Sequence, residues 1–306
     1  MKVQTYTLND TAHVTAYILD SQISYGVHRK RPAMIICPGG GYLTLATKEG
    51  EAVATSFLSQ GYHCFVLHYS TYHLERVTSL EETPIINPKA RYPQPILEIM
   101  QTILLLREHA QEWHLDDDNI FVTGFSAGGH LAASLGVHWD NPDFHQILEQ
   151  DFEPEDLKPK GLVLAYPLLE GHGGDYIAKN TPKEHLIAHQ LADMTDFFFQ
   201  TQEPSQVQKE AVSILPFINE KTPPTFLWIT GQDKIVDPRA CLLYAMKMQE
   251  LGLDCECHLF NNGPHGLARA DKVYAKSSTE VNRPVAVWMD MALTWLDGQM
   301  EKNHEY

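Results

Sequence analysis

The sequence predicts an α/β fold in which a mostly parallel sheet is covered by helices on both faces. Short, continuously apolar segments recur along the chain, which is typical of strands buried on both faces of a sheet. Segments with apolar residues at helical spacing alternate with them through much of the chain. Such alternation is typical of parallel sheets with helical crossovers. The 306 residues would allow two domains, but the continuous alternation favours a single domain, 1–306.

Eight segments are expected to form strands. The first two alternate polar and apolar residues on either side of a polar turn and therefore predict a hairpin. The later segments are short apolar runs bounded by glycine, proline or polar residues. In chain order the eight segments are residues 2–8, 13–19, 33–37, 64–69, 119–125, 161–167, 225–231 and 255–260.

Helices are expected where apolar residues follow a helical period. These segments are residues 50–60, 94–113, 131–135, 238–251 and 281–296, and the polar tail after residue 296 is expected to be frayed. Proline-containing, charged stretches at 70–92 and 138–160 are expected to be surface excursions. The alternation of strands and helices stops between residues 168 and 222, so we predict a cap insertion over 168–222.

The central motif is Gly-x-Ser-x-Gly at residues 124–128, which follows the strand 119–125 and precedes a helix. A serine on such a sharp turn is exposed at the edge of the sheet, and the two glycines avoid clashes between strand and helix. This context predicts a nucleophile elbow with Ser126 as the nucleophile. The free N–H group of Ala127, at the start of the helix, is then placed to stabilise an oxyanion.

A serine nucleophile needs a base and a carboxylate that orients the base. His265 follows the last predicted strand in Gly-Pro-His-Gly, and Asp233 follows the strand before it. Both lie after the carboxyl ends of strands, where ligands bind in open α/β sheets. The order Ser126, Asp233, His265 is the order of triads built on a nucleophile elbow. Three glycines at 39–41, after the strand 33–37, favour backbone N–H groups that approach a ligand closely.

Four motifs together resemble the α/β-hydrolase superfamily. They are Pro-Gly-Gly-Gly-Tyr at 38–42, Gly-Phe-Ser-Ala-Gly-Gly-His at 124–130, Gly-Gln-Asp-Lys-Ile-Val at 231–236 and Pro-His-Gly at 264–266. Within the superfamily, the chain looks most like the bacterial esterase/lipase group that includes acetyl-xylan-esterase-like carboxylesterases. Pro38 stands where related hormone-sensitive-lipase-like enzymes have the histidine of His-Gly-Gly-Gly, which moves the resemblance toward the carbohydrate esterases.

This resemblance implies roles for individual residues. Gly40 and Gly41 would bind the oxyanion together with Ala127. The family's Asp-x-x-Val pattern begins at Asp233, so the resemblance makes Asp233 the triad acid and leaves Asp237 as the alternative.

The resemblance implies a serine carboxylesterase that acts on short-acyl esters, with acetylated carbohydrates as candidate substrates. The alternatives are an amidase, formamidase or peptidase with the same triad, and a non-catalytic binding protein on the same scaffold. No cofactor is implied. His185 and His189 are spaced to share a helix face, but no glutamate follows the first as in zinc proteases, so no metal site is predicted.

The formal net charge of -16 argues against nucleic acid and anionic membrane surfaces as partners and says little about the substrate. The small-molecule ester expected as the ligand is what the resemblance implies. The N-terminal residues show no signal-peptide pattern, and no segment is apolar for long enough to span a bilayer, so a cytoplasmic location is expected. Five cysteines, an odd number, fit reduced thiols better than a disulfide framework. The sequence leaves open whether the protein forms a homo-oligomer.

Overall fold

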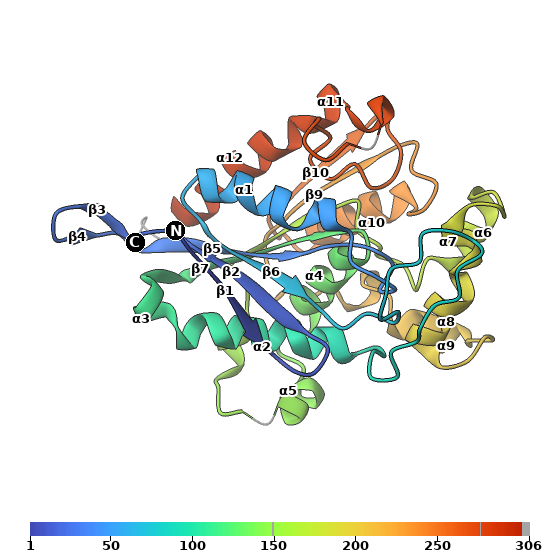
Figure 1. Ribbon diagram of the computed structural model, residues 1–306, viewed down its shortest axis with the longest axis horizontal. Coiled ribbons are helices and arrows are strands. Elements are labelled where there is room, and N and C mark those ends of the chain that lie inside the picture. Colours follow the sequence, from blue (N-terminus) through green and yellow to red (C-terminus); the bar gives the residue numbers. More distant parts are fainter. Residues whose placement is uncertain (149, 276, 302–306) are drawn as a thin grey trace.

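An eight-stranded sheet forms the centre of the computed structural model, which describes residues 1–148, 150–275 and 277–301 (Figure 1). Its strand order is β1-β2-β6-β5-β7-β8-β9-β10. The strands are β1 (Lys2–Thr7), β2 (His13–Ile18), β5 (Arg31–Cys37), β6 (His63–His68), β7 (Leu115–Phe125), β8 (Gly161–Ala165), β9 (Thr225–Thr230) and β10 (Cys255–Phe260). Each of the eight predicted segments contributes one of these strands, which confirms the predicted fold class.

Six neighbouring strands, from β6 to β10 in the sheet order, pair in parallel, whereas β1 pairs antiparallel with β2 and β2 pairs antiparallel with β6. Among them, β8 and β9 are buried along their whole length because both faces of the sheet are covered there. In the register, Ile36 of β5 lies opposite Val66 of β6 and Thr123 of β7. The carboxyl ends of these strands therefore meet at one edge of the sheet, and the loops that carry the predicted site residues leave from this edge.

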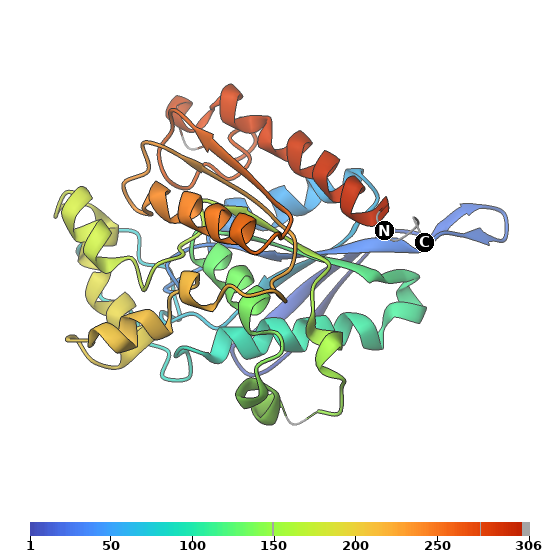
Figure 2. The same cartoon turned by 180° about the vertical axis from the view of Figure 1, so that it is seen from behind.

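Helices cover both faces of the sheet, as Figures 1 and 2 show. The helices α1 (Glu51–Ser59) and α12 (Trp288–Glu301) lie on one face, and α2 (Gln94–Glu108) and α4 (Ala127–His138) lie on the other. The helix α10 (Pro238–Glu250) packs against β9 and β10. Shorter elements are η1 (Thr47–Glu49), α3 (Ala110–Trp113), α5 (Pro142–Leu148), η2 (Pro154–Leu157), η4 (Ser278–Glu280) and α11 (Arg283–Ala286).

Two predicted helices differ in extent from the observed ones. The predicted helix 94–113 divides at His109 into α2 and α3, and α3 ends where His114 adopts a left-handed conformation. The last helix continues to Glu301, because Gln299 is buried and Met300 packs against the core beyond the predicted end at Leu296. The rest of the tail, residues 302–306, lies outside the described residues.

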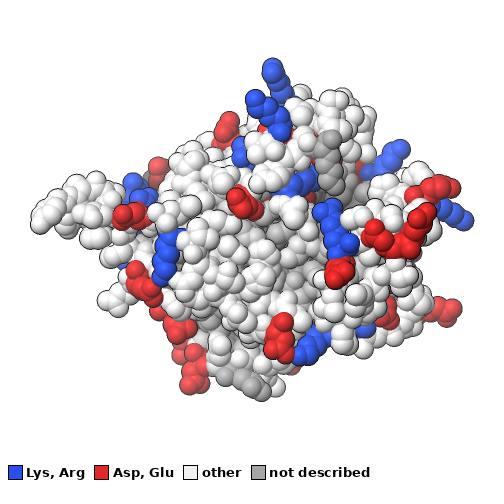
Figure 3. All heavy atoms as spheres, in the orientation of Figure 1, with Lys and Arg blue, Asp and Glu red and all other residues white. Residues whose placement is uncertain are grey.

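A second, two-stranded sheet of β3 (Gln22–Ser24) and β4 (Val27–His28) was not predicted. It projects from the body of the molecule as an arm without charged residues (Figure 3). Its strands are exposed on both faces, so their residues lack the burial pattern from which a strand can be recognised in a sequence.

Four helices lie between β8 and β9: α6 (Gly174–Asn180), α7 (Leu186–His189), α8 (Leu191–Phe199) and α9 (Gln206–Ala211), followed by η3 (Leu215–Phe217). Figure 1 shows them grouped at the end of the sheet to which the carboxyl ends of the parallel strands point. They occupy the segment 168–222, for which a role as a cap stays a prediction.

The core contains large aromatic side chains between sheet and helices. Trp228 of β9 and Trp288 of α12 are fully buried, and their rings lie 5.4 Å apart. All five cysteines are free thiols, and three of them are buried. Within the described part of the chain, the helices are too short or too polar to cross a lipid bilayer.

Candidate active site

Ser126 lies on a sharp turn between β7, which ends at Phe125, and α4, which begins at Ala127. Its backbone adopts φ 52° and ψ -115°, a conformation that non-glycine residues rarely occupy. Such strain costs about 1–3 kcal/mol and persists where the surrounding structure enforces it. Hydrogen bonds from Ser126 N to Ala165 O and from Leu168 N to Ser126 O, both 3.1 Å, hold this backbone in place.

The glycines of the motif allow strand, turn and helix to approach each other closely. A Cβ atom on Gly124 would lie 2.1 Å from the carbonyl oxygen of Gly128. A Cβ atom on Gly128 would lie 2.0 Å from the carbonyl oxygen of Cys37. Both distances are far below van der Waals contact, so only glycine fits at these two positions. The two glycines of the sequence motif are thus required by the close packing at the turn.

Three predicted residues form a continuous hydrogen-bond chain. The Nε2 atom of His265 lies 2.8 Å from Ser126 Oγ, and its Nδ1 atom lies 2.7 Å from Asp233 Oδ2. His265 follows β10 and Asp233 follows β9, so two adjacent strands deliver them to the serine. The arrangement can transfer the serine proton to the imidazole, while the carboxylate holds the ring in its orientation.

Asp233 is buried, and backbone groups fix its carboxylate. Its Oδ1 atom accepts hydrogen bonds from Ile235 N at 2.8 Å and Val236 N at 2.9 Å, which leaves Oδ2 for His265. Burial alone would lower the pKa of His265, but the charge of Asp233 and its hydrogen bond outweigh this effect and raise the pKa above 6.5. A raised pKa makes His265 a better proton acceptor.

The alternative acid, Asp237, lies elsewhere. Its carboxylate caps α10 by accepting a 3.0 Å hydrogen bond from Arg239 N, and it forms an ion pair with the Arg239 guanidinium. Both the hydrogen bond and the ion pair lower the pKa of Asp237. The geometry therefore places Asp233, and not Asp237, beside His265.

Three N–H groups face the same cavity as Ser126. Gly40, Gly41 and Ala127 line this cavity, and in the described part of the chain their backbone N–H groups have no hydrogen-bond acceptor. The loop that carries the two glycines is folded back by hydrogen bonds from Leu43 N and Thr44 N to Gly40 O. These N–H groups are available to bind an oxyanion.

A buried pair that the sequence analysis missed supports this site. The Glu49 carboxylate accepts hydrogen bonds from Gly39 N at 2.7 Å and from the Tyr166 hydroxyl at 2.7 Å. Burial raises the pKa of Glu49, whereas both hydrogen bonds lower it. The Tyr166 ring also contacts the His265 ring edge-on, with 5.0 Å between the centroids. In the sequence, the only signal for this pair was the position of Tyr166 directly after a buried strand.

A second missed pair fixes the elbow helix to the glycine loop. His130 is buried in α4, and its Nδ1 atom lies 2.8 Å from the Tyr42 hydroxyl. Its Nε2 atom lies 2.7 Å from Val212 O, so the ring donates from Nε2 and accepts at Nδ1. Burial lowers the pKa of His130 to about 4, which keeps the ring neutral at pH 7. Tyr42 follows the three glycines directly, which was the only sequence hint.

The catalytic cavity has a volume of about 290 Å³. Ser126 and His265 line it together with apolar side chains of the 168–222 segment, namely Leu168, Ile177, Leu186, Ile187 and Met194. This volume lies at the lower end of the roughly 300–1,000 Å³ that is usual for ligand sites. The cavity therefore suits a small apolar group next to the serine.

The histidines considered for metal binding do not form a cluster. His185 lies at the start of α7, where its Nδ1 atom accepts a 3.3 Å hydrogen bond from Ile187 N, and His189 ends the same helix. Over residues 1–148, 150–275 and 277–301, no group of three or more His, Cys, Asp or Glu side chains is arranged to hold a metal ion.

Comparison with known proteins identifies the fold family of the chain. A family model described as the alpha/beta hydrolase fold matches residues 86–269. The solved structure of the carboxylesterase Cest-2923 from Lactobacillus plantarum is 26% identical and superimposes with a TM-score of 0.75, covering 98% of each chain.

Two longer relatives also match. Endo-1,4-beta-xylanase B of Butyrivibrio fibrisolvens is 28% identical over 244 residues, which are 79% of this chain and 33% of the relative. The acetylxylan esterase of Xylanibacter ruminicola is 20% identical over 236 residues, which are 76% of this chain and 40% of the relative. This chain thus spans well under half the length of these two relatives.

Proposed function

This chain belongs to the α/β-hydrolase fold family, and from that premise we propose that it is a serine carboxylesterase that hydrolyses short-acyl esters. The observation that carries the proposal is the unbroken hydrogen-bond chain from Asp233 through His265 to Ser126, which ends at a cavity lined by free N–H groups. A nucleophile, its base, the orienting acid and oxyanion donors are the four parts that acyl transfer requires.

The reaction proceeds in two halves. His265 Nε2 accepts the proton of Ser126 as Oγ attacks the ester carbonyl, and the resulting oxyanion is stabilised by the N–H groups of the glycine loop and of Ala127. The imidazolium then protonates the leaving alcohol, and an acyl-enzyme remains. In the second half, His265 accepts a proton from water, the hydroxide attacks the acyl-enzyme, and Ser126 leaves with the proton restored.

The catalytic cavity favours a small acyl group. Its volume of about 290 Å³ must hold the acyl group and part of the alcohol. A long acyl chain would have to pass Lys48 and Arg76, whose charged side chains also line the cavity. Displacing water from charged groups without new partners is unfavourable. Acetyl and similarly short esters are therefore the proposed substrates.

Acetylated carbohydrates are the proposed class of ester. An acetylxylan esterase is among the relatives, and a second relative is named as a xylanase, although this chain covers only a minor part of each. The rim of the catalytic cavity also carries Arg76, His185 and Gln190, whose polar groups are suited to sugar hydroxyls.

The experiment is active-site labelling combined with hydrolysis of esters of increasing length. The purified protein is incubated with a fluorophosphonate probe, digested and analysed by mass spectrometry, while p-nitrophenyl esters from acetate upward are assayed in parallel. We expect modification of Ser126 and fastest turnover of the acetate or propionate ester. The matched control is Ser134→Ala, a serine in the same helix, which should keep labelling and turnover.

The Ser126→Ala variant tests whether Ser126 is the nucleophile. It should keep the circular dichroism spectrum and lose both labelling and turnover, since alanine tolerates the turn no worse than serine. Full esterase activity in Ser126→Ala would contradict the proposal. Turnover of p-nitroacetanilide above that of p-nitrophenyl acetate would identify an amidase, and a folded protein without any labelling would favour the non-catalytic alternative.

A further inference from the structure

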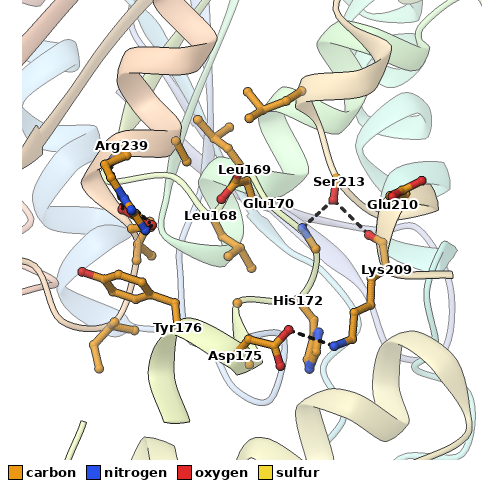
Figure 4. A pocket seen from close by; sticks show the side chains of 18 of the residues that line it. Leu168, Leu169, Glu170, His172, Asp175, Tyr176, Lys209, Glu210, Ser213 and Arg239 are labelled. Carbon is orange, nitrogen blue, oxygen red and sulfur yellow. Dashed lines mark hydrogen bonds and ion pairs between the residues drawn. The ribbon is translucent and has the colours of Figure 1, made fainter. Parts of the chain in front are cut away.

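A second cavity, of about 520 Å³, lies beside the catalytic cavity (Figure 4). It is formed by the connection after β8, by α6 and α9, and by the start of α10. Four residues line both cavities: Leu168, His172, Ile235 and Val236. A ligand that is too large for the catalytic cavity therefore meets the second cavity across these shared residues.

The second cavity has a fixed position relative to the triad. Tyr176 of α6 lines it, and its hydroxyl donates a 2.8 Å hydrogen bond to the carbonyl oxygen of Asp233. Thr181, directly after α6, donates a 3.0 Å hydrogen bond to Lys234 O. The loop of the triad acid therefore holds one wall of the cavity, so a group bound there has a defined distance to Ser126.

The charges around the second cavity nearly cancel. In Figure 4, Arg239 and Tyr176 lie on one side, and Lys209, which forms a 2.8 Å ion pair with Asp175, lies on the other. Arg239 forms its ion pair with Asp237. Two of the lining cations, Lys209 and Arg239, are thus paired with anions at the cavity. A strongly charged ligand would have to compete with these pairs.

Glu170 supplies an acceptor without a partner. Its carboxylate makes no hydrogen bond or ion pair with any residue that the structure describes, although it lines the cavity. The Glu170 side chain is exposed to solvent at the cavity. Partial burial and the nearby charge of Asp237 raise its pKa, whereas the charge of Arg239 lowers it, so a donor from a ligand would take the place of water at this carboxylate. A hydroxyl group is the donor that fits, because it brings no charge into a balanced site.

From these features we propose that the second cavity binds a neutral sugar residue of the alcohol part of the ester, adjacent to the residue whose ester is cleaved. Sugar hydroxyls can donate to Glu170 and accept from the cationic side chains, and the ring of Tyr176 offers an apolar face. A fatty acyl chain would leave these charged groups without water or partners. The proposal rests on the proposed esterase function and adds to it a preference for oligosaccharide esters.

The test compares two substrates in two matched variants. Acetylated xylotetraose reaches both cavities, whereas p-nitrophenyl acetate fills only the catalytic one. Glu170→Gln removes the acceptor charge in the second cavity, and Glu250→Gln makes the same change at an exposed position at the end of α10. We expect the ratio of kcat/KM for acetylated xylotetraose to kcat/KM for p-nitrophenyl acetate to fall roughly tenfold in Glu170→Gln, mainly through KM. Glu250→Gln should keep the wild-type ratio.

A binding measurement separates this proposal from the proposed function. Calorimetric titration of acetylated xylotetraose into the Ser126→Ala variant measures binding without turnover. The double variant Ser126→Ala/Glu170→Gln should bind this ligand roughly tenfold more weakly than Ser126→Ala alone. Equal ratios and equal affinities in the Glu170→Gln and Glu250→Gln backgrounds would overturn the sugar site while leaving the esterase intact. If the wild type hydrolyses no ester, the proposed function fails, and the titration alone then decides whether the cavity binds the sugar.

Discussion

The Tyr166 hydroxyl donates a 2.7 Å hydrogen bond to Glu49 Oε1, and this bond connects the two halves of the active site. On one side, Glu49 Oε2 accepts from Gly39 N, at the start of the glycine loop. On the other side, the Tyr166 hydroxyl accepts a 2.8 Å hydrogen bond from Ala268 N, three residues after His265. The pair therefore ties the start of the glycine loop to the segment that follows His265.

Glu49→Gln should lower kcat for p-nitrophenyl acetate by roughly 10-fold to 100-fold with little change in KM. Gly39 N and the Tyr166 hydroxyl bond different oxygens of Glu49, and glutamine replaces one of these oxygens by an NH₂ group that cannot accept. One of the two hydrogen bonds is therefore lost, and the glycine loop loses part of its support. Steady-state kinetics provide the measurement, and Glu51→Gln, at an exposed position two residues later, is the control. Wild-type kcat in Glu49→Gln would show that the pair does not position the loop.

The pH dependence of kcat/KM should show an acid limb above pH 6.5. His265 acts as a base only when neutral, and its pKa is raised because the charges of Asp233 and Glu49 outweigh the effect of burial. Activity therefore falls as pH falls through this raised pKa. In Glu49→Gln the limb should move to lower pH, because one of the two charges is gone. A limb that stays in place or moves upward in this variant would contradict the electrostatic role of Glu49.

The sheet could be predicted from the sequence, and a candidate triad could be proposed from it, because each has a local signal. Parallel strands buried on both faces appear as apolar runs, and the steric demands of the elbow appear as Gly124 and Gly128 around Ser126. His265 and Asp233 could be placed because both directly follow strands.

The supporting contacts could not be predicted, because they join distant positions. Glu49 and Tyr166 are 117 residues apart, and Tyr42 and His130 are 88 apart. Such pairs exist only once the strand order brings β5, β7 and β8 together. The second cavity was missed for the same reason, since residues around Glu170 and Arg239 meet only in the folded chain.

Substitution of the two candidate acids should affect different properties of the protein, kcat for Asp233 and stability for Asp237. Asp233→Asn should lower kcat by roughly 10³–10⁴-fold, because the imidazolium loses its stabilising charge and the ring its orientation. Asp237→Ala should instead lower the free energy of unfolding by about 0.5–2 kcal/mol through loss of the α10 cap, with kcat for p-nitrophenyl acetate within a few-fold of wild type. Kinetics and urea denaturation of both variants test this. The reverse pattern would make Asp237 the triad acid.

Gly40→Ala should abolish most of the activity. Gly40 has φ +125°, and a Cβ atom there would lie 1.9 Å from the carbonyl oxygen of Thr44, so the glycine loop must shift. A displaced loop misplaces its N–H groups relative to Ser126, and removal of a single oxyanion donor costs roughly 10²–10³-fold in kcat. The control is Gly298→Ala in α12, where a Cβ atom meets nothing within 4 Å and helix propensity favours alanine by about 1 kcal/mol. Unchanged kcat in Gly40→Ala would exclude this loop from oxyanion binding.

Tyr42→Phe should destabilise the protein more than the loss of one exposed hydroxyl would. The Tyr42 hydroxyl donates to His130 Nδ1 at 2.8 Å, and both side chains are buried. Phenylalanine leaves this acceptor only the longer, 3.4 Å contact with the Ser134 hydroxyl. Such a loss costs about 1–3 kcal/mol. Since the pKa of His130 is lowered to about 4, protonation cannot supply a compensating charge at pH 7. Urea denaturation measures the change, and Tyr25→Phe, at a fully exposed position, should leave the midpoint unchanged. Equal midpoints for the two variants would show that this hydrogen bond contributes nothing to the connection between the glycine loop and the elbow helix.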